Sequence, residues 1–377
     1  MDDTAAYVNA TATDTGNGGG SVVGAYQVQT GVDTSTFGPG WGAGTWSRGA
    51  WNSRASVNVL SENLRLWQHD TFGEDLVFCI RDGPVFYWDT SGTTSQRGVY
   101  LSSLASASNT PTIAKQVMVS DVDRHVIAFG CNPLGSNAQD PLLIRFSDQE
   151  NPADWTPRTT NTAGDLRIGS GTAIVQAVET RQEILVFTDQ ALHSMQFIGP
   201  PYTFGINRVS ENITIRSPNA AVAVGDSVYW MGVDQFYVYR GNVNQLNCTV
   251  KEKILTDINN EQSTKIFAGI NSGFQEIWWF YPSVNSDNVD KYVVYNYDMD
   301  IWYYGTLNRT AWIDRGIDDF PIAAGTDGKL YFHEYEIDDQ SGSSPVAVES
   351  FIQSAPIDLG DGETFSYVRK LIPDVTF

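Results

Sequence analysis

The chain has 377 residues, of which 41% are hydrophobic and 12% are aromatic, and this composition excludes a disordered protein. The 23 Lys and Arg are outnumbered by 44 Asp and Glu, so the formal net charge is −21. Because phosphates repel such a chain, we expect neither tight nucleic acid binding nor attraction to an anionic membrane surface. The sequence shows no leader pattern and no run of about 18 apolar residues, so a soluble protein without its own export signal is expected.

Residues 1–60 are predicted to form an N-terminal arm with little regular structure. The cluster from Gly16 to Gly20 lies among many Thr, Ala and Ser residues without a hydrophobic period. Farther on, Trp41, Trp46 and Trp51 alternate with glycines in a spacing that suits neither a helix nor a strand. We expect these indoles to pack on the domain that follows, and a ligand-binding aromatic strip is the alternative.

From residue 61 to residue 340 the chain repeats one arrangement, in which short apolar strands alternate with tight polar turns. A period of about 50 residues is typical of a β-propeller, in which each repeat forms one antiparallel sheet beside a central channel. We therefore predict an all-β fold, a β-propeller of about six antiparallel blades. The second strands of the repeats are expected to begin near Leu76, Val126, Ile184, Val228, Ile277 and Leu330.

The fourth, fifth and sixth repeats have the clearest strand patterns. β-Branched and aromatic residues bounded by Gly, Asp and Asn predict strands in all three. The only helix expected is a short connector over residues 250–258. The expected strands are 221–224, 227–231 and 235–239 in the fourth repeat, 265–269, 276–281, 291–297 and 301–304 in the fifth, and a hairpin of 321–324 with 329–332 in the sixth.

Residues 341–377 are predicted to form a C-terminal β segment. Its last part, residues 365–372, has the composition of an apolar strand. Two interpretations remain open, because this strand either closes the propeller ring by pairing with the first blade or begins a further β domain.

The three cysteines, Cys79, Cys131 and Cys248, show no metal-binding spacing, and an odd number makes a poor disulfide framework. Synthesis in a reducing cytoplasm fits this pattern. Cys79 is flanked by Phe78 and Ile80 within a predicted strand, and we expect it to be a core residue.

Some propellers are glycosidases, which need two carboxylates placed across a sugar at roughly 5–9.5 Å. With 44 acids in the chain, neighbouring pairs are expected by chance, and we predict that these pairs lie in solvated turns. No catalytic residue is therefore assigned. The pairs are Asp298 with Asp300, Asp318 with Asp319, and Asp121 with Asp123.

Metal and cofactor motifs are also missing from the sequence. Gly16–Gly20 and Gly169-Ser-Gly171 lack the Lys-Ser/Thr and the helix that a phosphate-binding loop requires. The four histidines are scattered among different repeats without metal-ligand spacing, which predicts hydrogen-bonded structural residues. We predict no metal site and no cofactor. The histidines are His69, His125, His193 and His333.

Several stretches resemble structural proteins of tailed bacteriophages, and the nearest functional family is the tail nozzle, or packaged-DNA stabilisation, proteins of short-tailed phages. The resemblance extends over most of residues 37–377. Its motifs are structural and do not belong to one role alone. They are Gly40–Trp46, Leu64–Trp67 with Phe72–Leu76, Asp140–Asp148 with Asp154–Pro157, Phe197–Tyr202, Asn308–Trp312 and Asp358–Gly362 with Pro373–Phe377.

The resemblance implies a non-enzymatic virion protein, made in the host cytoplasm, that forms a ring of six at the end of the tail tube and serves as a conduit for DNA. Its partners would be other copies of itself, tail adaptor and tail fibre proteins, and transiting DNA that is not held tightly. Acidic walls would let the duplex slide, with the lumen lying between subunits and not in the propeller's own channel. The arm before Gly40 is the predicted contact between subunits, and no membrane insertion is expected.

Two other functions remain open. One is a receptor-binding or glycan-binding tail propeller, whose exposed Trp and Tyr would stack on host sugars. The other is a propeller hydrolase acting on polysaccharide, which would need two or three acids meeting at one mouth of the channel.

Overall fold

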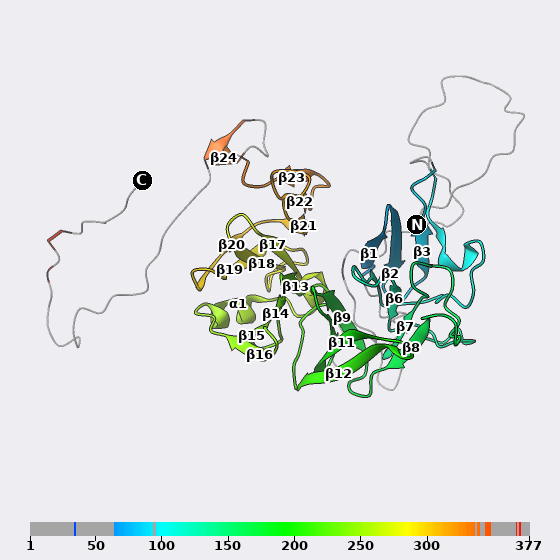
Figure 1. Cartoon of the computed structure of the whole chain (residues 1–377). Helices are drawn as coiled ribbons and strands as arrows, with labels where there is room; N and C mark the ends of the chain where they lie inside the picture. The colour runs from blue at the N-terminus through cyan, green and yellow to red at the C-terminus, as the bar shows by residue number, and fades with distance from the viewer. Residues whose placement is uncertain are drawn as a thin grey trace, which may run out of the picture. The chain divides into compact units, whose positions relative to one another are not determined.

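The structure is a computed structural model that describes residues 34, 64–92, 96–335, 338–339, 344–347, 367 and 369–370. The chain divides into two compact units between Arg65 and Leu66, and every described strand belongs to the second unit (Figure 1). In this unit, six antiparallel sheets form a six-bladed β-propeller, which confirms the predicted fold class. The predicted N-terminal arm, with its three tryptophans, and most of the C-terminal segment lie outside the described residues and stay predictions.

Each of the first three blades is a meander of four strands, and the strands follow the chain from the inner edge of the blade to its outer edge. Blade 1 contains β1 (Trp67–Phe72), β2 (Asp75–Ile80), β3 (Val85–Trp88) and β4 (Val99–Tyr100); blade 2 contains β5 (Gln116–Val119), β6 (Val126–Phe129), β7 (Leu143–Phe146) and β8 (Gly164–Arg167); blade 3 contains β9 (Ile174–Glu179), β10 (Ile184–Thr188), β11 (Ala191–Gly199) and β12 (Thr203–Glu211).

Blades 4 and 5 repeat this plan, and blade 6 has three described strands. A separate pair of short strands follows, and one helix, α1 (Lys251–Asp257), connects blades 4 and 5. Blade 4 contains β13 (Ala221–Val224), β14 (Ser227–Met231), β15 (Phe236–Tyr239) and β16 (Val243–Leu246); blade 5 contains β17 (Phe267–Asn271), β18 (Glu276–Tyr281), β19 (Lys291–Asn296) and β20 (Ile301–Thr306); blade 6 contains β21 (Arg309–Ile313), β22 (Ile322–Gly325) and β23 (Leu330–Phe332); the last pair is β24 (Asp338–Asp339) with β25 (Val346–Ala347).

The local sequence accounts for the hairpins. Between β13 and β14, Gly225 has a φ of +60°, a left-handed conformation that glycine adopts without steric cost. The strands predicted in the fourth and fifth repeats are confirmed to within two residues at each end, and so is the helical connector. In α1, Ile254 is buried against the hydrophobic core.

One detail of the prediction was wrong in the sixth repeat. The strand at Leu330 is the third of its sheet, and the second is β22, which begins at Ile322. The innermost strand is β21, whose Trp312 stacks on Trp278 of blade 5 with ring centroids 5.4 Å apart. Sequence periodicity missed β21 because its burial is carried by this one indole, while its neighbours are polar or exposed.

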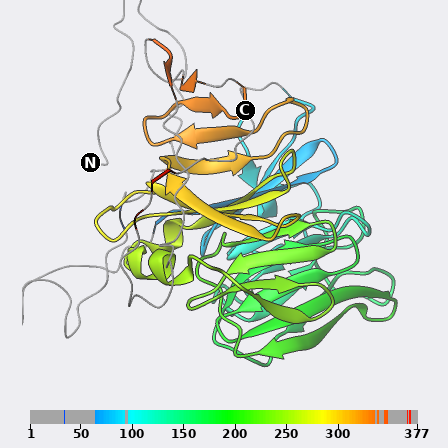
Figure 2. The same cartoon turned by 90° about the vertical axis from the view of Figure 1, so that its left-hand side faces the viewer.

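The hydrophobic core is divided among the spaces between consecutive blades, where the sheets lie face to face (Figure 2). The largest cluster joins blades 3, 4 and 5, and it contains Trp230 and Trp279, both 0% exposed. Smaller clusters join blades 1 and 2, blades 2 and 3, and blades 5 and 6. The propeller is therefore held together by contacts between neighbouring blades.

Candidate functional site

The central channel is crossed by a side-chain hydrogen bond. Gln68 on β1 donates from Nε2 to Oδ1 of Asn219, just before β13, over 2.8 Å. Blades 1 and 4 are opposite each other in a ring of six, so this bond spans the channel. Asn219 is further held by its backbone oxygen, which accepts from the N–H of Ala268 on β17 at 2.8 Å. At this level the channel is filled by side chains and leaves no passage for a duplex.

Two glutamine side chains connect the inner strands of neighbouring blades by equivalent hydrogen bonds. Gln116 on β5 donates from Nε2 to the backbone oxygen of Ala177 (2.8 Å), and its Oε1 accepts from the Ala177 N–H (2.7 Å). Gln176 on β9 makes the equivalent pair with Ala221 on β13, at 3.0 and 3.1 Å. Both glutamines are buried. Backbone groups that point away from their own sheet are thereby satisfied by the next blade.

Four acids from three segments gather at one end of the inner strands. Asp70 on β1 accepts from the N–H of Val119 at 2.8 Å, and Glu179 on β9 accepts from the N–H of Asp121 at 3.0 Å. Asp123 lies in the same turn, between β5 and β6. The two carboxylates that accept these bonds therefore hold the end of β5 between blades 1 and 3. We call Asp70, Asp121, Asp123 and Glu179 the acidic cluster.

Three carboxyl groups of the acidic cluster have raised pKa values. Burial raises the pKa of Asp70, and the Asp121 carboxylate raises it further. Burial raises the pKa of Glu179 to about 7, and the carboxylates of Asp121, Asp70 and Asp123 contribute to this rise. Burial likewise raises the pKa of Asp123. Negative charge is thus unfavourable here, because the carboxylates are close together and partly removed from water.

The raised pKa of Glu179 predicts a pH-dependent stability. Its pKa is near 4.5 in the unfolded chain and about 7 in the folded one, so the folded state loses stability as pH rises through this window. Glu179→Gln keeps an acceptor for the Asp121 N–H and removes the charge. We expect this variant to raise the free energy of unfolding by about 1 kcal/mol at pH 8, a value reduced for solvent screening, and to change it little at pH 4. Urea unfolding at both pH values measures this.

The matched control for this prediction is Glu150→Gln, which changes an exposed carboxylate with 69% side-chain exposure. It is expected to leave the pH profile unchanged. An identical pH dependence for the wild type and Glu179→Gln would contradict the assignment.

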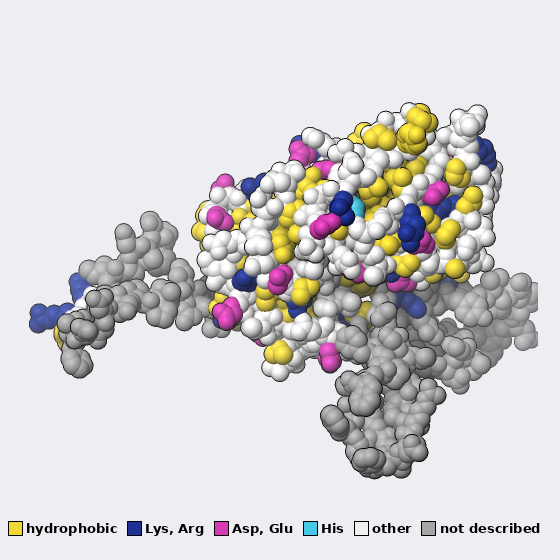
Figure 3. Space-filling view, turned by 90° about the horizontal axis from the view of Figure 1, so that it is seen from below, with side chains coloured by type: hydrophobic (Ala, Val, Ile, Leu, Met, Phe, Trp, Pro, Cys, Tyr) yellow, Lys and Arg dark blue, Asp and Glu magenta, His cyan; other side chains and the backbone are white. Residues whose placement is uncertain are grey.

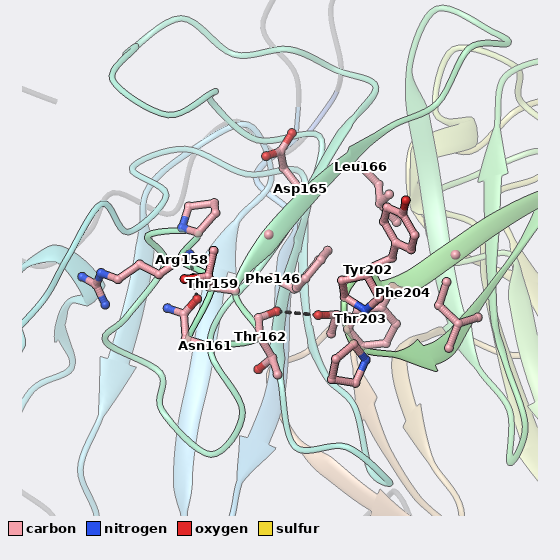
Figure 4. A pocket seen from close by; sticks show the side chains of 17 residues that line it. Phe146, Arg158, Thr159, Asn161, Thr162, Asp165, Leu166, Tyr202, Thr203 and Phe204 are labelled. Carbon is pink, nitrogen blue, oxygen red and sulfur yellow. Dashed lines mark hydrogen bonds between the residues drawn. The ribbon is translucent and has the colours of Figure 1, made fainter.

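A cleft of about 840 Å³ lies between the outer parts of blades 2 and 3. Figure 4 shows Arg158, Thr159 and Asn161 on one side of it and Tyr202 and Phe204 on the other. The sides meet where Thr203 Oγ1 donates to the backbone oxygen of Thr162 at 2.9 Å. The cleft is therefore a preformed groove with polar groups on one wall and aromatic rings on the other.

The chemistry of the cleft suits a ligand that has both an apolar face and hydroxyl groups. The Tyr202 side chain is 73% exposed and follows the cis Pro200–Pro201 peptide. The Arg158 guanidinium is held by Asp154 at 2.6 Å, so it contributes little free positive charge. Amides and hydroxyls on one wall can exchange hydrogen bonds with a sugar, and a tyrosine ring can cover its apolar face.

The structure places the three predicted acid pairs in turns and loops. Asp298 and Asp300 are exposed in the turn between β19 and β20, where Asp300 accepts a hydrogen bond from Tyr295 at 2.9 Å. Asp318 and Asp319 are exposed between β21 and β22. Asp121 and Asp123 belong to the acidic cluster. Sequence reasoning missed Asp70 and Glu179, which lie on the inner strands β1 and β9.

Three of the four histidines have structural partners, as predicted. His125 Nε2 lies 3.0 Å from Thr162 Oγ1, and His193 Nε2 lies 2.8 Å from Ser170 Oγ. His333 accepts from Arg309 Nε at 2.9 Å, and burial together with this guanidinium lowers the pKa of His333 to about 4. His69 is exposed on β1.

The cysteines and the glycine motif also have structural roles. Cys79 is 0% exposed, which confirms that it is a core residue, and burial raises its pKa to about 12. The predicted Gly169-Ser-Gly171 loop connects β8 to β9, and Ser170 is the partner of His193. Among the described residues, no group of three His, Cys, Asp or Glu side chains could hold a metal ion. That part of the chain also contains no helix long and apolar enough to cross a membrane.

Comparison with known proteins yields structures but no family. No family model matches the chain, and no curated protein matches it. Two similar solved structures are the extracellular domain of a proposed one-component system from B. thetaiotaomicron and PorZ, a surface component of the type-IX secretion system of Porphyromonas gingivalis. Their TM-scores are both 0.41, with 9% and 10% identity over 76% and 77% of this chain. The matched part is 33% of each of those chains, so the chain spans about a third of their length.

Proposed function

We propose that the protein is a non-enzymatic virion component, a tail nozzle or hub whose copies form a ring that conducts and helps retain packaged DNA. The resemblance of several sequence stretches to nozzle proteins of short-tailed phages supports a role in the tail. The hydrogen bond between Gln68 and Asn219 supports a conduit that lies outside the propeller's own channel. A channel filled by side chains carries no duplex, so the DNA path lies between copies, and each propeller is scaffold.

The charge of the chain supports the same proposal. A net charge of −21 weakens attachment to phosphates, which a conduit requires if DNA is to slide. The face seen in Figure 3 carries acidic and basic side chains scattered among hydrophobic ones, with no broad basic surface. This described face therefore has no broad basic surface that would bind DNA tightly. The packaged DNA is retained because the opening of the ring is narrow, and not because the protein binds it.

The proposal is tested with virions that contain this chain. Particles assembled from a genome with the corresponding gene deleted are expected to lack the tail tip and to lose their DNA, measured as nuclease-sensitive genome after purification. Supplying the chain in trans restores nuclease resistance. Deletion particles that stay full and infectious would contradict the proposal.

A second candidate function, glycan binding by a tail propeller, is favoured by the cleft between blades 2 and 3. Tyr202 is exposed opposite Thr159 and Asn161, an arrangement that can stack on one face of a sugar and hydrogen-bond its edge. A glycan array probed with the purified chain and with Tyr202→Ala tests it. Glycan binding by the wild-type chain that is lost in Tyr202→Ala supports this function. No binding by the wild-type chain at millimolar glycan contradicts it.

The acidic cluster provides one observation in favour of the alternative function, a polysaccharide hydrolase. A carboxyl with a pKa of about 7 beside other carboxylates occurs in glycosidases as well as in structural clusters. Asp70 and Glu179 each accept a hydrogen bond from a backbone N–H of blade 2, so these two carboxylates have a structural role in joining the blades. We expect no release of reducing sugar from polysaccharide, and release that Glu179→Gln abolishes would overturn the non-enzymatic proposal.

A further inference from the structure

One face of blade 6 carries exposed apolar side chains, of which Phe332 lies beside the exposed ring of Tyr335 with ring centroids 6.3 Å apart. The register pairs Ile313 with Ile322 and Ile322 with Phe332, and it places Leu330 on the same face. Ile313, Leu330 and Phe332 are 64%, 75% and 59% exposed. The opposite face of this sheet carries Trp312 and is packed on blade 5.

Blade 1 presents a matching apolar face. Trp67, Phe78, Phe86 and Tyr100 come from its four successive strands, with ring centroids 6.1, 5.1 and 5.1 Å apart. Trp67 and Tyr100, at the two ends of this ladder, are 44% and 54% exposed. The other face of the sheet is buried against blade 2. Blades 6 and 1 are neighbours in the ring, so the two apolar faces border one junction, which we call the notch.

A second apolar feature protrudes from blade 3. β11 and β12 each have nine residues, whereas β10 pairs with β11 only as far as Met195. Beyond that point the hairpin has no third strand. It ends in Phe197, Ile198 and Tyr202, which are 42%, 57% and 73% exposed. We call residues 197–202 the knob.

The knob and the notch lie on opposite sides of the propeller, because blade 3 is opposite blade 6, which forms one side of the notch (Figure 1). We propose that the knob of one copy packs into the notch of the next copy. Such a head-to-tail contact uses two different surfaces and closes into a ring when the rotation between copies allows it. Copies that carry a charge of −21 repel one another, so their contact requires apolar surfaces of this kind.

This inference rests on the proposed function, because it identifies the two surfaces through which neighbouring copies in the proposed ring contact each other. It is tested by native mass spectrometry of the full chain with one variant in each surface. Ile198→Asp in the knob and Phe332→Asp in the notch are each expected to convert the oligomer to monomer. An equimolar mixture of the two retains one intact knob and one intact notch, so it is expected to form a dimer and nothing larger.

The control is Val284→Asp, which changes an apolar residue that is 55% exposed in the loop after β18. It is expected to leave the oligomer unchanged, and circular dichroism verifies that all variants stay folded. Oligomers that persist in both surface variants would overturn the contact and leave the proposed ring in place. A wild-type chain that is monomeric at every concentration would overturn both. A Phe332→Asp chain that unfolds more easily while remaining oligomeric would show that the chain's own segments fill the notch.

Discussion

Trp279→Ala is expected to lower the free energy of unfolding by about 3–5 kcal/mol. The indole is 0% exposed, and it lies against Phe236 and Trp302 with ring centroids 5.0 and 5.9 Å apart. Its Nε1 also donates to the backbone oxygen of Ala220 at 3.0 Å. Truncation therefore opens a cavity between blades 4 and 5 and removes one of the hydrogen bonds that join them.

Urea unfolding followed by circular dichroism measures this change without relying on tryptophan fluorescence. Phe274→Ala is the matched control, because that aromatic residue belongs to the same blade but is 51% exposed. Its truncation is expected to change the free energy of unfolding by less than about 0.5 kcal/mol. Equal losses from both variants would contradict the assignment of the core to the spaces between blades.

Gln176→Leu is expected to lower the free energy of unfolding by about 2–4 kcal/mol, although leucine is the more hydrophobic residue. The Met231 N–H bonds to the oxygen of Ala220, so alternation along β13 directs the groups of Ala221 away from its own sheet. Gln176 satisfies both of them. Leucine would leave a buried N–H and a buried C=O without partners, and each costs about 1–3 kcal/mol.

The control for this prediction is Gln245→Leu on β16, where the side chain is exposed. We expect this control to unfold at the same urea concentration as the wild type. A Gln176→Leu chain as stable as the control would mean that the amide does not hold blades 3 and 4 together. The same logic applies to Gln116, which bonds both backbone groups of Ala177.

Much of the fold could be predicted because each blade is a local structure. Neighbouring strands are joined by short turns, so β-branched and aromatic runs such as those of β14 and β18 predict whole hairpins. The prediction was wrong where a strand depends on a distant partner. β21 is defined by the packing of Trp312 on blade 5, and no pattern within residues 309–313 reveals that contact.

The sites were harder to predict because they join residues that are far apart in the sequence. Asp70, Asp121 and Glu179 are about 50 and 60 residues apart, and only the ring brings them together. The same holds for Gln68 and Asn219, which come from opposite blades. The knob coincides with one of the stretches that resemble phage proteins, but its exposure and its position across the ring from the notch depend on the fold. Composition predicted a protein that does not hold DNA tightly, and this remains a prediction.

The proposed function requires that DNA pass between copies of the chain and not through any propeller. Electron cryomicroscopy of DNA-filled virions, with this chain located in the tail, tests it most directly. We expect a six-fold ring of propellers around continuous DNA density on the tail axis, with the channel of each propeller closed at Gln68 and Asn219. DNA density inside a propeller channel, or a tail without this chain, would contradict it.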